Sequence, residues 1–378
     1  GLLRVYGPKT ARQGTDLVEI PQTGLCVGRD PKGNATWPVA DSQLSKNHLV
    51  FSPAHCGENS ENHTGRNTAG ENYTVVDLDS TNGTFLQGRR LEPQIAHPLK
   101  NGAVLRCGQT ILVFLKNLHP IVEHQTDSER YGLIGRFHSP VILAELVDAL
   151  SLSPHLLLSG ASGTGKELAA KALHQLLIEQ SRATPQDLPL VACNCAHFAN
   201  PEEAKTSLFG VRQGVFSGVE KRTGFLESAE NGILFLDEFH LLAPDVQRSL
   251  LRFVEDGIYA RIGNTTNRKL AVRIVFATNT DVETACENGG LAFDLVHRLH
   301  RVHLFPLHQR RADVVDIFCH HLHRTSTQFG LDGRAVLADL TPTHFEALTL
   351  LDYGTKNVRT VVHLVEQFVL RLHRNSER

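Results

Sequence analysis

The segment "GASGTGKE" at residues 160–167 has the residue types of a loop that binds phosphate. It follows an apolar run and precedes residues 168–177, whose apolar side chains fall on one helical face. Glycines let the backbone fold around a phosphate, so that the N–H groups of the helix start point inward. Lys166 then lies beside the β- and γ-phosphates, although Glu167 stands where the strict pattern has Ser or Thr. The predicted ATP-binding residues here are Gly160, Ala161, Ser162, Gly163, Thr164, Gly165, Lys166 and Glu167.

Two adjacent carboxylates form a second candidate group. The run "ILFLDE" at residues 233–238 indicates a buried strand that delivers Asp237 and Glu238 at its carboxyl end, where α/β proteins bind ligands. Asp237 can hold Mg²⁺ through water, and Glu238 can orient or deprotonate the attacking water. A further run, "RIVFATN", ends in Asn279, which can sense the γ-phosphate. These residues predict an ATP hydrolase whose cofactors are ATP and Mg²⁺.

An α/β domain must position these groups. Continuous apolar runs typical of parallel strands buried on both faces lie at residues 155–160, 189–194, 233–238 and 273–278. Helical segments alternate with them, which indicates a doubly wound P-loop core over residues 131–308. Strand patterns stop near residue 309, and residues 309–378 are predicted to form a helical lid.

The first part of the chain has a different periodicity. Residues 1–117 hold short β-branched and aromatic runs separated by Gly, Asn, Asp and Pro, which predicts an all-β sandwich. Strands are expected at residues 16–20, 25–28, 48–51, 73–78, 84–88, 103–108 and 110–115. Residues 118–130 are polar and are predicted to be a linker.

Composition describes an ordinary cytoplasmic protein. The net charge of −2 gives no global attraction to nucleic acid or anionic lipid, and no run is long enough to cross a bilayer. Seven cysteines without a CxxC pair favour reduced thiols. His320, His321 and His323 have no paired Cys or Asp, so we interpret them as surface residues rather than metal ligands.

The motifs from residue 131 to 375 together resemble the AAA+ domain of bacterial enhancer-binding proteins, the activators of sigma-54 RNA polymerase. The resemblance runs in order through "LIGRFHSP", "GASGTGKE", "NCA", "GVFSG", "GILFLDE", "VRIVFATN" and "NVR". In that family a glutamate after the P-loop lysine is usual. The resemblance implies a switch residue at Asn194, a sensor at Asn279, a second sensor at Arg359 and an arginine finger at Arg298. A finger acts on a neighbouring subunit, so a hexameric ring is implied.

The segment "GVFSGV" resembles the family's GAFTGA loop, which contacts sigma-54. The implied contact residues are Gly214, Val215, Phe216, Ser217 and Gly218. Valines replace the family's alanines, which stiffens the loop. Ala292 stands where the family usually has a first finger arginine, so slow hydrolysis is expected. The segment "GTKNVRT" replaces the family's WPGNVREL, so the entry turn of the lid is expected to differ.

Residues 1–115 resemble the forkhead-associated (FHA) domain, a reader of phosphothreonine peptides. The resemblance rests on "VGRD", "LSKNH" and "DLDSTNGTFLQG", which lie on three predicted loops. A doubly charged phosphate requires a guanidinium together with hydroxyl or amide donors. The resemblance implies that Arg29, Ser45 and Lys46 take the phosphate, and that Thr81 and Asn82 hold the peptide backbone.

The leading interpretation is a phosphorylation-responsive sigma-54 activator that hydrolyses ATP to remodel the closed promoter complex. Its partners would be sigma-54 RNA polymerase, a phosphothreonine protein such as a Ser/Thr kinase, and further copies of itself. One alternative is a phosphopeptide-binding adaptor with a degenerate ATPase half. Another is an AAA+ remodeller of a different protein. No helix-turn-helix or basic patch predicts direct DNA binding, and nothing predicts membrane association.

Overall fold

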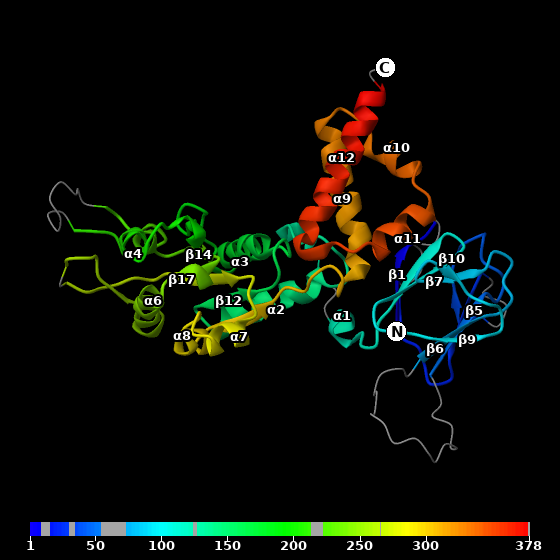
Figure 1. Ribbon diagram of the computed structural model, residues 1–378, viewed down its shortest axis with the longest axis horizontal. Coiled ribbons are helices and arrows are strands. Elements are labelled where there is room, and N and C mark those ends of the chain that lie inside the picture. The colour runs from blue at the N-terminus through cyan, green and yellow to red at the C-terminus, as the bar shows by residue number, and fades with distance from the viewer. Residues whose placement is uncertain are drawn as a thin grey trace, which may run out of the picture.

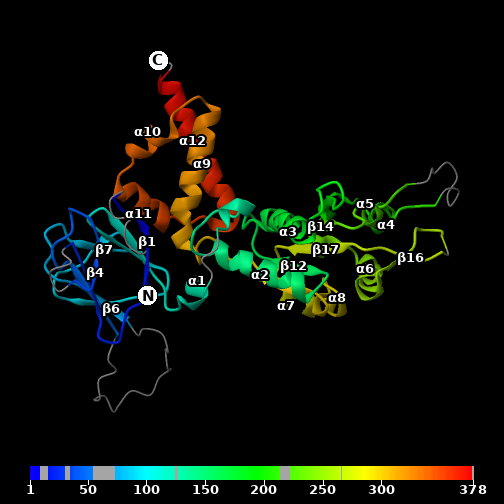
Figure 2. The same cartoon turned by 180° about the vertical axis from the view of Figure 1, so that it is seen from behind.

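The computed structural model describes residues 1–8, 16–29, 35–53, 73–123, 127–212, 222–264 and 266–376. Three bodies follow one another along the long axis of the molecule (Figure 1). A β-sandwich lies at one end, an α/β domain at the other, and a group of C-terminal helices between them. The view from behind gives the same order (Figure 2). The predicted fold class, an FHA-like sandwich followed by a P-loop α/β domain with a helical lid, is confirmed.

Two sheets form the sandwich. The first has the order β2-β1-β11-β10-β7-β8 and the second β4-β3-β5-β6-β9. The first sheet comprises β1 (Leu2–Tyr6), β2 (Leu17–Val18), β7 (Thr84–Leu86), β8 (Arg89–Arg90), β10 (Ala103–Cys107) and β11 (Thr110–Phe114). The second comprises β3 (Leu25–Gly28), β4 (Trp37–Pro38), β5 (Leu49–Pro53), β6 (Tyr73–Asp77) and β9 (Ala96–Pro98). The strand expected at 16–20 is thus only two residues long.

Strand β11 is apolar on both of its faces, and this explains what surrounds it. Leu112 and Phe114 point into the sandwich core. Ile111 and Val113 belong to a second cluster, which they share with the C-terminal helices. Side chains alternate between the faces of a strand, so a strand that is apolar at four consecutive positions, 111–114, must be covered on both sides.

The α/β domain contains a five-stranded parallel sheet with the order β13-β14-β17-β12-β18. Its strands are β12 (Leu156–Ser159), β13 (Leu190–Asn194), β14 (Ile233–Asp237), β17 (Arg273–Thr278) and β18 (His300–His303). The first four lie where apolar runs predicted them. The fifth was not predicted, because its sequence "HRVH" lies at the sheet edge and has one buried residue, Val302.

Helices cover both faces of this sheet (Figure 1). They are α2 (Ser139–Leu152), α3 (Lys166–Ser181), α4 (Pro201–Phe209), α5 (Phe225–Ser228), α6 (Pro244–Asp256), α7 (Val282–Glu287) and α8 (Phe293–His297). One face packs α2 and α3 through residues such as Leu146 and Leu173. The other packs α6 and α8 through Leu250 and Leu295. A short hairpin pairs β15 (Ile258–Tyr259) with β16 (Arg268–Lys269).

The helical lid consists of α9 (Val314–Gln328), α10 (Gly333–Ala338), α11 (Pro342–Leu350) and α12 (Val358–Ser376), with short 3₁₀ turns at Arg311–Asp313 and Gly354–Lys356. Helices α9 and α12 pack along each other through residues that include Phe318 and Val365. In the described part of the chain, no helix combines the length and apolar character that crossing a bilayer requires.

The segment after the sandwich differs from the polar linker that the sequence predicted. It begins with the helix α1 (His119–Glu123), and Leu118 and Ile121 are buried in the cluster that the sandwich shares with the lid. A 3₁₀ turn, Glu129–Tyr131, then leads into the α/β domain. Leu118 and Ile121 dock the segment, although its composition as a whole is polar.

The sandwich packs directly on the lid, and we call this contact the sandwich–lid interface. The rings of Tyr6 in β1 and Phe345 in α11 stack with their centroids 4.1 Å apart. Arg106 in β10 forms an ion pair of 2.6 Å with Glu346 in α11. The apolar cluster beneath these contacts runs from Val5 and Val104 to the lid helices. The motifs of the two domains do not specify this contact; the one local sign of it is the apolar run of β11, which faces both clusters.

Candidate nucleotide and phosphopeptide sites

The glycine-rich segment forms a loop between β12 and α3. Gly160, Gly163 and Gly165 have φ of 149°, 74° and 105°, values that favour glycine. A Cβ on Gly163 would lie 2.1 Å from the carbonyl oxygen of Lys356, whereas the space around Gly165 is open to 4 Å. The loop therefore presses against the lid on one side and leaves room at the start of α3.

Lys166 begins α3 with only 7% of its surface exposed. Its Nζ donates to the carbonyl oxygens of Gly160 at 2.7 Å and Ala161 at 3.3 Å. Burial lowers the pKa of Lys166, and the carboxylates of Glu238 and Asp237 raise it. The ammonium is thus held inside the loop, facing the acidic end of β14. Glu167 points outward and pairs with Lys171 at 2.7 Å.

The two acids lie at the carboxyl end of β14, as predicted. Glu238 has a left-handed backbone with φ 53°, which turns its side chain away from the strand direction. Its Oε1 accepts a hydrogen bond of 2.9 Å from Asn279 Nδ2. The structure thus brings Asp237, Glu238 and Asn279 together with Lys166. Asn194 ends the neighbouring strand β13 opposite Asp237, and its Oδ1 caps the Ala196 N–H at 2.9 Å.

His240 is an addition that sequence reasoning missed. Its Nδ1 lies 3.0 Å from Thr278 Oγ1 and 3.5 Å from Glu238 Oε2. Burial lowers the pKa of His240, and Glu238 raises it. The imidazole therefore borders the carboxylate oxygen that Asn279 does not hold. The sequence signal that could have identified His240 is its position two residues after Glu238.

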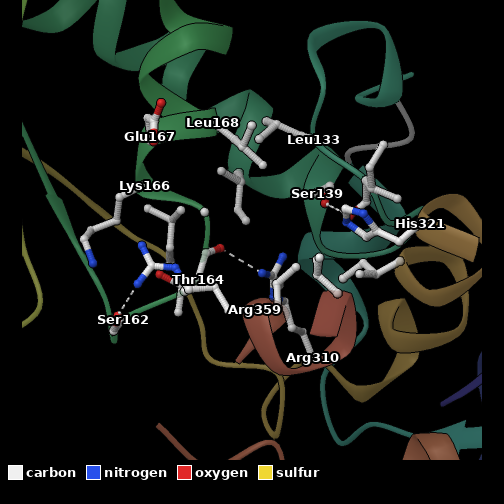
Figure 3. Close-up of a pocket in the computed structure, with 18 of the residues that line it drawn as sticks. Leu133, Ser139, Ser162, Thr164, Lys166, Glu167, Leu168, Arg310, His321 and Arg359 are labelled. Carbon is white, nitrogen blue, oxygen red and sulfur yellow. Dashed lines mark hydrogen bonds between the residues drawn. The ribbon is translucent and has the colours of Figure 1, made fainter. Parts of the chain in front are cut away.

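Three lid residues close the phosphate loop from the other side. Arg359 donates from Nη1 to Ser162 Oγ at 3.1 Å, and buried Arg310 donates from Nη2 to the Thr164 carbonyl at 2.9 Å (Figure 3). Asn357, in a left-handed conformation, donates to the Ser162 carbonyl at 3.0 Å and accepts from Leu307 N–H at 2.9 Å. Arg359 was predicted; Arg310 and Asn357 were not.

These elements enclose a cavity of 360 Å³. Its phosphate end is formed by the loop, Asp237 and Glu238. Its other end is largely apolar and is lined by Leu133, Ile134, Ile142, Ile317, Val358 and Val362. His321 lines this end and lies near Ser139 in Figure 3. His321, which the sequence analysis interpreted as a surface residue, is half-buried in the cavity wall, and this burial lowers its pKa.

The predicted finger residue lies away from this cavity. Arg298 directly follows α8 and pairs through Nη2 with Glu255 Oε1 at 2.5 Å. The predicted sigma-54 contact residues 214–218 lie outside the described residues. The described residues on either side of them pair in an antiparallel bridge. The Val211 N–H donates to the Arg222 carbonyl at 2.9 Å, and the Arg222 N–H donates to the Val211 carbonyl at 3.2 Å.

The residues present fit a magnesium-bound nucleoside triphosphate. A loop with glycine dihedrals, an ammonium and a guanidinium supply the cationic and N–H groups that phosphates require. Asp237 and Glu238 supply the carboxylates through which Mg²⁺ is usually held. The apolar end of the cavity has the character of a site for a flat heterocycle.

The second candidate site lies on the loops of the sandwich. Ser45 Oγ accepts from the Thr81 N–H at 3.1 Å and lies 3.4 Å from Thr81 Oγ1. Asn82 Nδ2 donates to the Gln43 carbonyl at 2.7 Å, and Arg29 Nη1 donates to the Ser42 carbonyl at 3.3 Å. Four of the five predicted residues thus join neighbouring loops, and all four are accessible; Lys46 is exposed beside Ser45.

Buried residues hold these loops in place. His48 accepts from the Ser45 N–H through Nδ1 at 3.1 Å, and its Nε2 lies 3.3 Å from the Gly83 carbonyl. A Cβ on Gly28 would lie 1.9 Å from the Lys46 carbonyl oxygen, so the two loops touch only because residue 28 is glycine. Asp77 accepts from Ser80 and Thr84, and these hydrogen bonds lower its pKa against the opposing effect of burial.

Comparison with known proteins bears on both halves. Residues 139–305 match the Sigma-54 interaction domain family and residues 25–108 the FHA domain family. The anaerobic nitric oxide reductase transcription regulator NorR of Salmonella heidelberg (strain SL476) is 38% identical over 222 residues, which are 57% of this chain and 41% of NorR. The transcriptional regulatory protein XylR of Pseudomonas putida is 37% identical over 263 residues, 67% of this chain and 43% of XylR. The chain thus spans less than half the length of these relatives.

Solved structures agree with this comparison. The crystal structure of NtrX from Brucella abortus in complex with ADP superposes with a TM-score of 0.53 at 26% identity, covering 68% of this chain and 54% of that one. A complex of NtrX with ATP is similar at a TM-score of 0.50, 27% identity, and 61% and 50% coverage. The described fold of each half thus agrees with the family model that matches it, the sandwich with the FHA domain and the α/β domain with the Sigma-54 interaction domain.

Proposed function

We propose that this protein is a sigma-54-dependent transcriptional activator whose ATPase is controlled by a phosphothreonine-reading FHA domain. The observation that carries the ATPase proposal is the convergence of Lys166, Asp237, Glu238 and Arg359 on one cavity. The sigma-54 proposal follows from the family match and from relatives that are transcription regulators. We assign residues 1–117 to the reader, 131–308 to the ATPase core and 309–378 to the lid.

ATP would lie with its phosphates in the loop and its base at the apolar end of the cavity. Lys166 and Arg359 would counter the negative charge of the phosphates. Glu238, held through Oε1 by Asn279, is placed to orient water for in-line attack and to accept its proton. Mg²⁺ would be held near Asp237 and, when bound, neutralises charge on the phosphate oxygens.

Arg298 would complete the site of a neighbouring subunit, because its guanidinium lies outside the cavity of its own chain. This requires a ring, which we propose to be hexameric and to act in the cytoplasm. Arg298 must leave Glu255 to reach the next subunit. Hydrolysis would move residues 214–218 against sigma-54, and the FHA domain would bind a phosphothreonine on a kinase or on another copy through Arg29, Ser45, Lys46, Thr81 and Asn82.

The test is size exclusion of the purified chain with sigma-54, in ADP–aluminium fluoride and in ADP alone. A complex that forms only with aluminium fluoride and is lost on Phe216→Ala supports the proposal. A ring with ATP turnover that never captures sigma-54 points to a remodeller of another protein. A chain with neither ring nor turnover that still binds phosphothreonine peptide is an adaptor.

A further inference from the structure

The wall of the nucleotide cavity continues directly into a three-way junction. Leu133 and Ile134 line the apolar end of the cavity. The residues that follow them, up to His138, run between the lid and the sandwich, and we call residues 133–138 the junction segment. The contacts that fix the junction segment therefore also fix the positions of Leu133 and Ile134 in the cavity wall. The contacts of residues 135–138 therefore bear on the shape of the base end of the cavity.

The lid grips one side of the junction segment. The buried carboxylate of Asp313 accepts from the Phe137 N–H at 3.0 Å and from the His138 N–H at 3.1 Å. Gly135 has φ 124°, and a Cβ there would lie 2.6 Å from Asp313 Cγ. The backbone thus lies against the carboxylate that begins α9, the same helix that lines the cavity with Ile317 and His321.

Arg136 ties this segment to the sandwich as well. Its Nη1 donates to Asp16 Oδ2 at 2.6 Å and its Nη2 donates to the Val5 carbonyl at 2.9 Å, both in the sandwich. Its Nε and backbone N–H each donate to Asp316 Oδ2 in α9 at 3.1 Å. One residue therefore joins the α/β domain, the lid and the FHA-containing half through four hydrogen bonds, three from its side chain and one from its backbone N–H.

Three carboxylates and two guanidinium groups meet at this junction. Asp16 also pairs with Arg4 at 2.7 Å, so two guanidinium groups face Asp16 and Asp316, and the charge of the nearby Asp313 raises the pKa of Asp316. Burial raises the pKa of Asp316, and Arg136 lowers it. Removing Arg136 leaves Asp316 with less compensation, and removing Asp16 brings two cations together. Both changes loosen the junction segment without touching the phosphate loop.

We propose that Arg136 is a positioning residue for nucleotide binding, through which docking of the FHA domain on the lid sets the affinity for the base end of the nucleotide. The inference rests on the proposed ATP site. Docking of the FHA domain is predicted to strengthen nucleotide binding. Because coupling between two sites is reciprocal, bound nucleotide should in turn strengthen the contacts of Arg136 with Asp16 and Val5. The effect falls on binding, because no contact of Arg136 reaches Glu238, Asp237 or Lys166.

The test measures ATP turnover and the affinity for a fluorescent ATP analogue in the full chain. Arg136→Gln is expected to raise KM and the analogue Kd about tenfold, within the usual range of coupling between sites, with kcat unchanged within twofold. Asp16→Asn should shift Kd in the same direction. In the double variant the shift should not exceed that of Arg136→Gln alone, because both substitutions break one contact.

Arg106→Gln is the matched control, because the shared apolar cluster still docks the sandwich on the lid in this variant and the ion pair it removes touches no residue of the junction segment. Its Kd should equal that of the wild type. An unchanged Kd in a folded Arg136→Gln, or an equal rise in Arg106→Gln, would overturn the proposal. Arg136→Lys, which keeps a charge near the acids, should recover part of the affinity; a Lys variant as weak as Gln counts against the assignment. If the wild type neither binds the analogue nor turns over ATP, it is the proposed ATPase that fails.

Discussion

Arg106 Nε of strand β10 lies 2.6 Å from Glu346 Oε2 of helix α11, although the two residues are 240 positions apart in the chain. The Arg106 guanidinium also lies 3.9 Å from the centre of the Phe85 ring. Side-chain exposure is 16% for the arginine and 5% for the glutamate, so the pair is largely shielded from water. It connects the FHA domain to the lid at the rim of their shared apolar cluster.

We expect Glu346→Gln to lower the free energy of unfolding of the lid and sandwich by about 2 kcal/mol, because it leaves a shielded arginine without its anion. Denaturant titration of the full chain measures this. The control is Glu179→Gln, which weakens the exposed pair with Arg130 at 2.7 Å and should lower the free energy of unfolding much less than Glu346→Gln does. Equal losses of unfolding free energy in the two variants would show that shielding at the sandwich–lid interface does not strengthen the Arg106–Glu346 ion pair.

Glu238→Gln should retain nucleotide and lower the rate of hydrolysis at least about 100-fold, since the amide cannot accept a proton from water. Lys166→Ala should instead abolish binding, because it removes the buried ammonium of the loop. Analogue binding and phosphate release distinguish the two. Hydrolysis at the wild-type rate by Glu238→Gln would remove Glu238 from its proposed role.

His240 should influence kcat rather than KM, because its Nδ1 borders the free oxygen of Glu238. His240→Ala is expected to lower kcat about tenfold. His240→Asn places an amide where Nδ1 stood and should retain most of the rate, whereas His240→Gln, which extends toward Nε2, should not. If all three variants behave alike, the contact has no part in positioning Glu238.

Arg29→Ala should weaken binding of a phosphothreonine peptide by about 2 kcal/mol, roughly 30-fold, because it removes a charge-assisted hydrogen bond. Fluorescence anisotropy with the phosphorylated peptide and its unphosphorylated counterpart measures this. Lys100→Ala is the control, because Lys100 is an exposed cation in the turn between β9 and β10. A similar loss in that control would indicate attraction by general charge instead of a phosphate site.

His155 makes the folding stability of the α/β domain depend on pH in the acidic range. Burial, with a smaller effect of Arg273, lowers its pKa from 6.5 to about 4, and its Nδ1 accepts from the Ile274 N–H. The folded state therefore binds fewer protons than the unfolded state between these values. Its contribution to stability is complete above pH ~6.5 and falls by about 3 kcal/mol as pH drops toward 4. In denaturation measured from pH 7.5 to 4.5, His155→Asn should flatten this slope; an unchanged slope assigns it to other groups.

Local sequence patterns predicted most of what local forces determine. The run at 273–278 became β17 with the same bounds, because its four apolar residues at 274–277, rich in β-branched and aromatic side chains and too few for a helix, favour a short buried strand. The loop glycines and the paired acids followed from the chemistry of phosphate. Strand β18 was missed because pairing with β12 makes it a strand, and that pairing is not local.

Long-range contacts account for the other omissions. Arg310 and Asn357 touch the phosphate loop from more than 140 residues away. Arg310 lies in none of the quoted motifs, and Asn357 begins the "NVR" motif, in which only Arg359 was given a role. The contact between Arg136 and Asp16 joins two domains whose sequence signatures are complete without each other. What hinted at it was strand β11, apolar on both faces where a freely exposed sandwich would alternate.

That same strand has a practical consequence for anyone who divides the protein. A fragment cut at residue 117 would carry Val5, Val104, Ile111 and Val113 as a bare apolar patch on an otherwise folded domain. Such patches promote self-association, so the isolated FHA domain should self-associate in solution even when it is correctly folded. Two fragments produced separately should find each other through this patch, which would allow the protein to be reassembled from pieces.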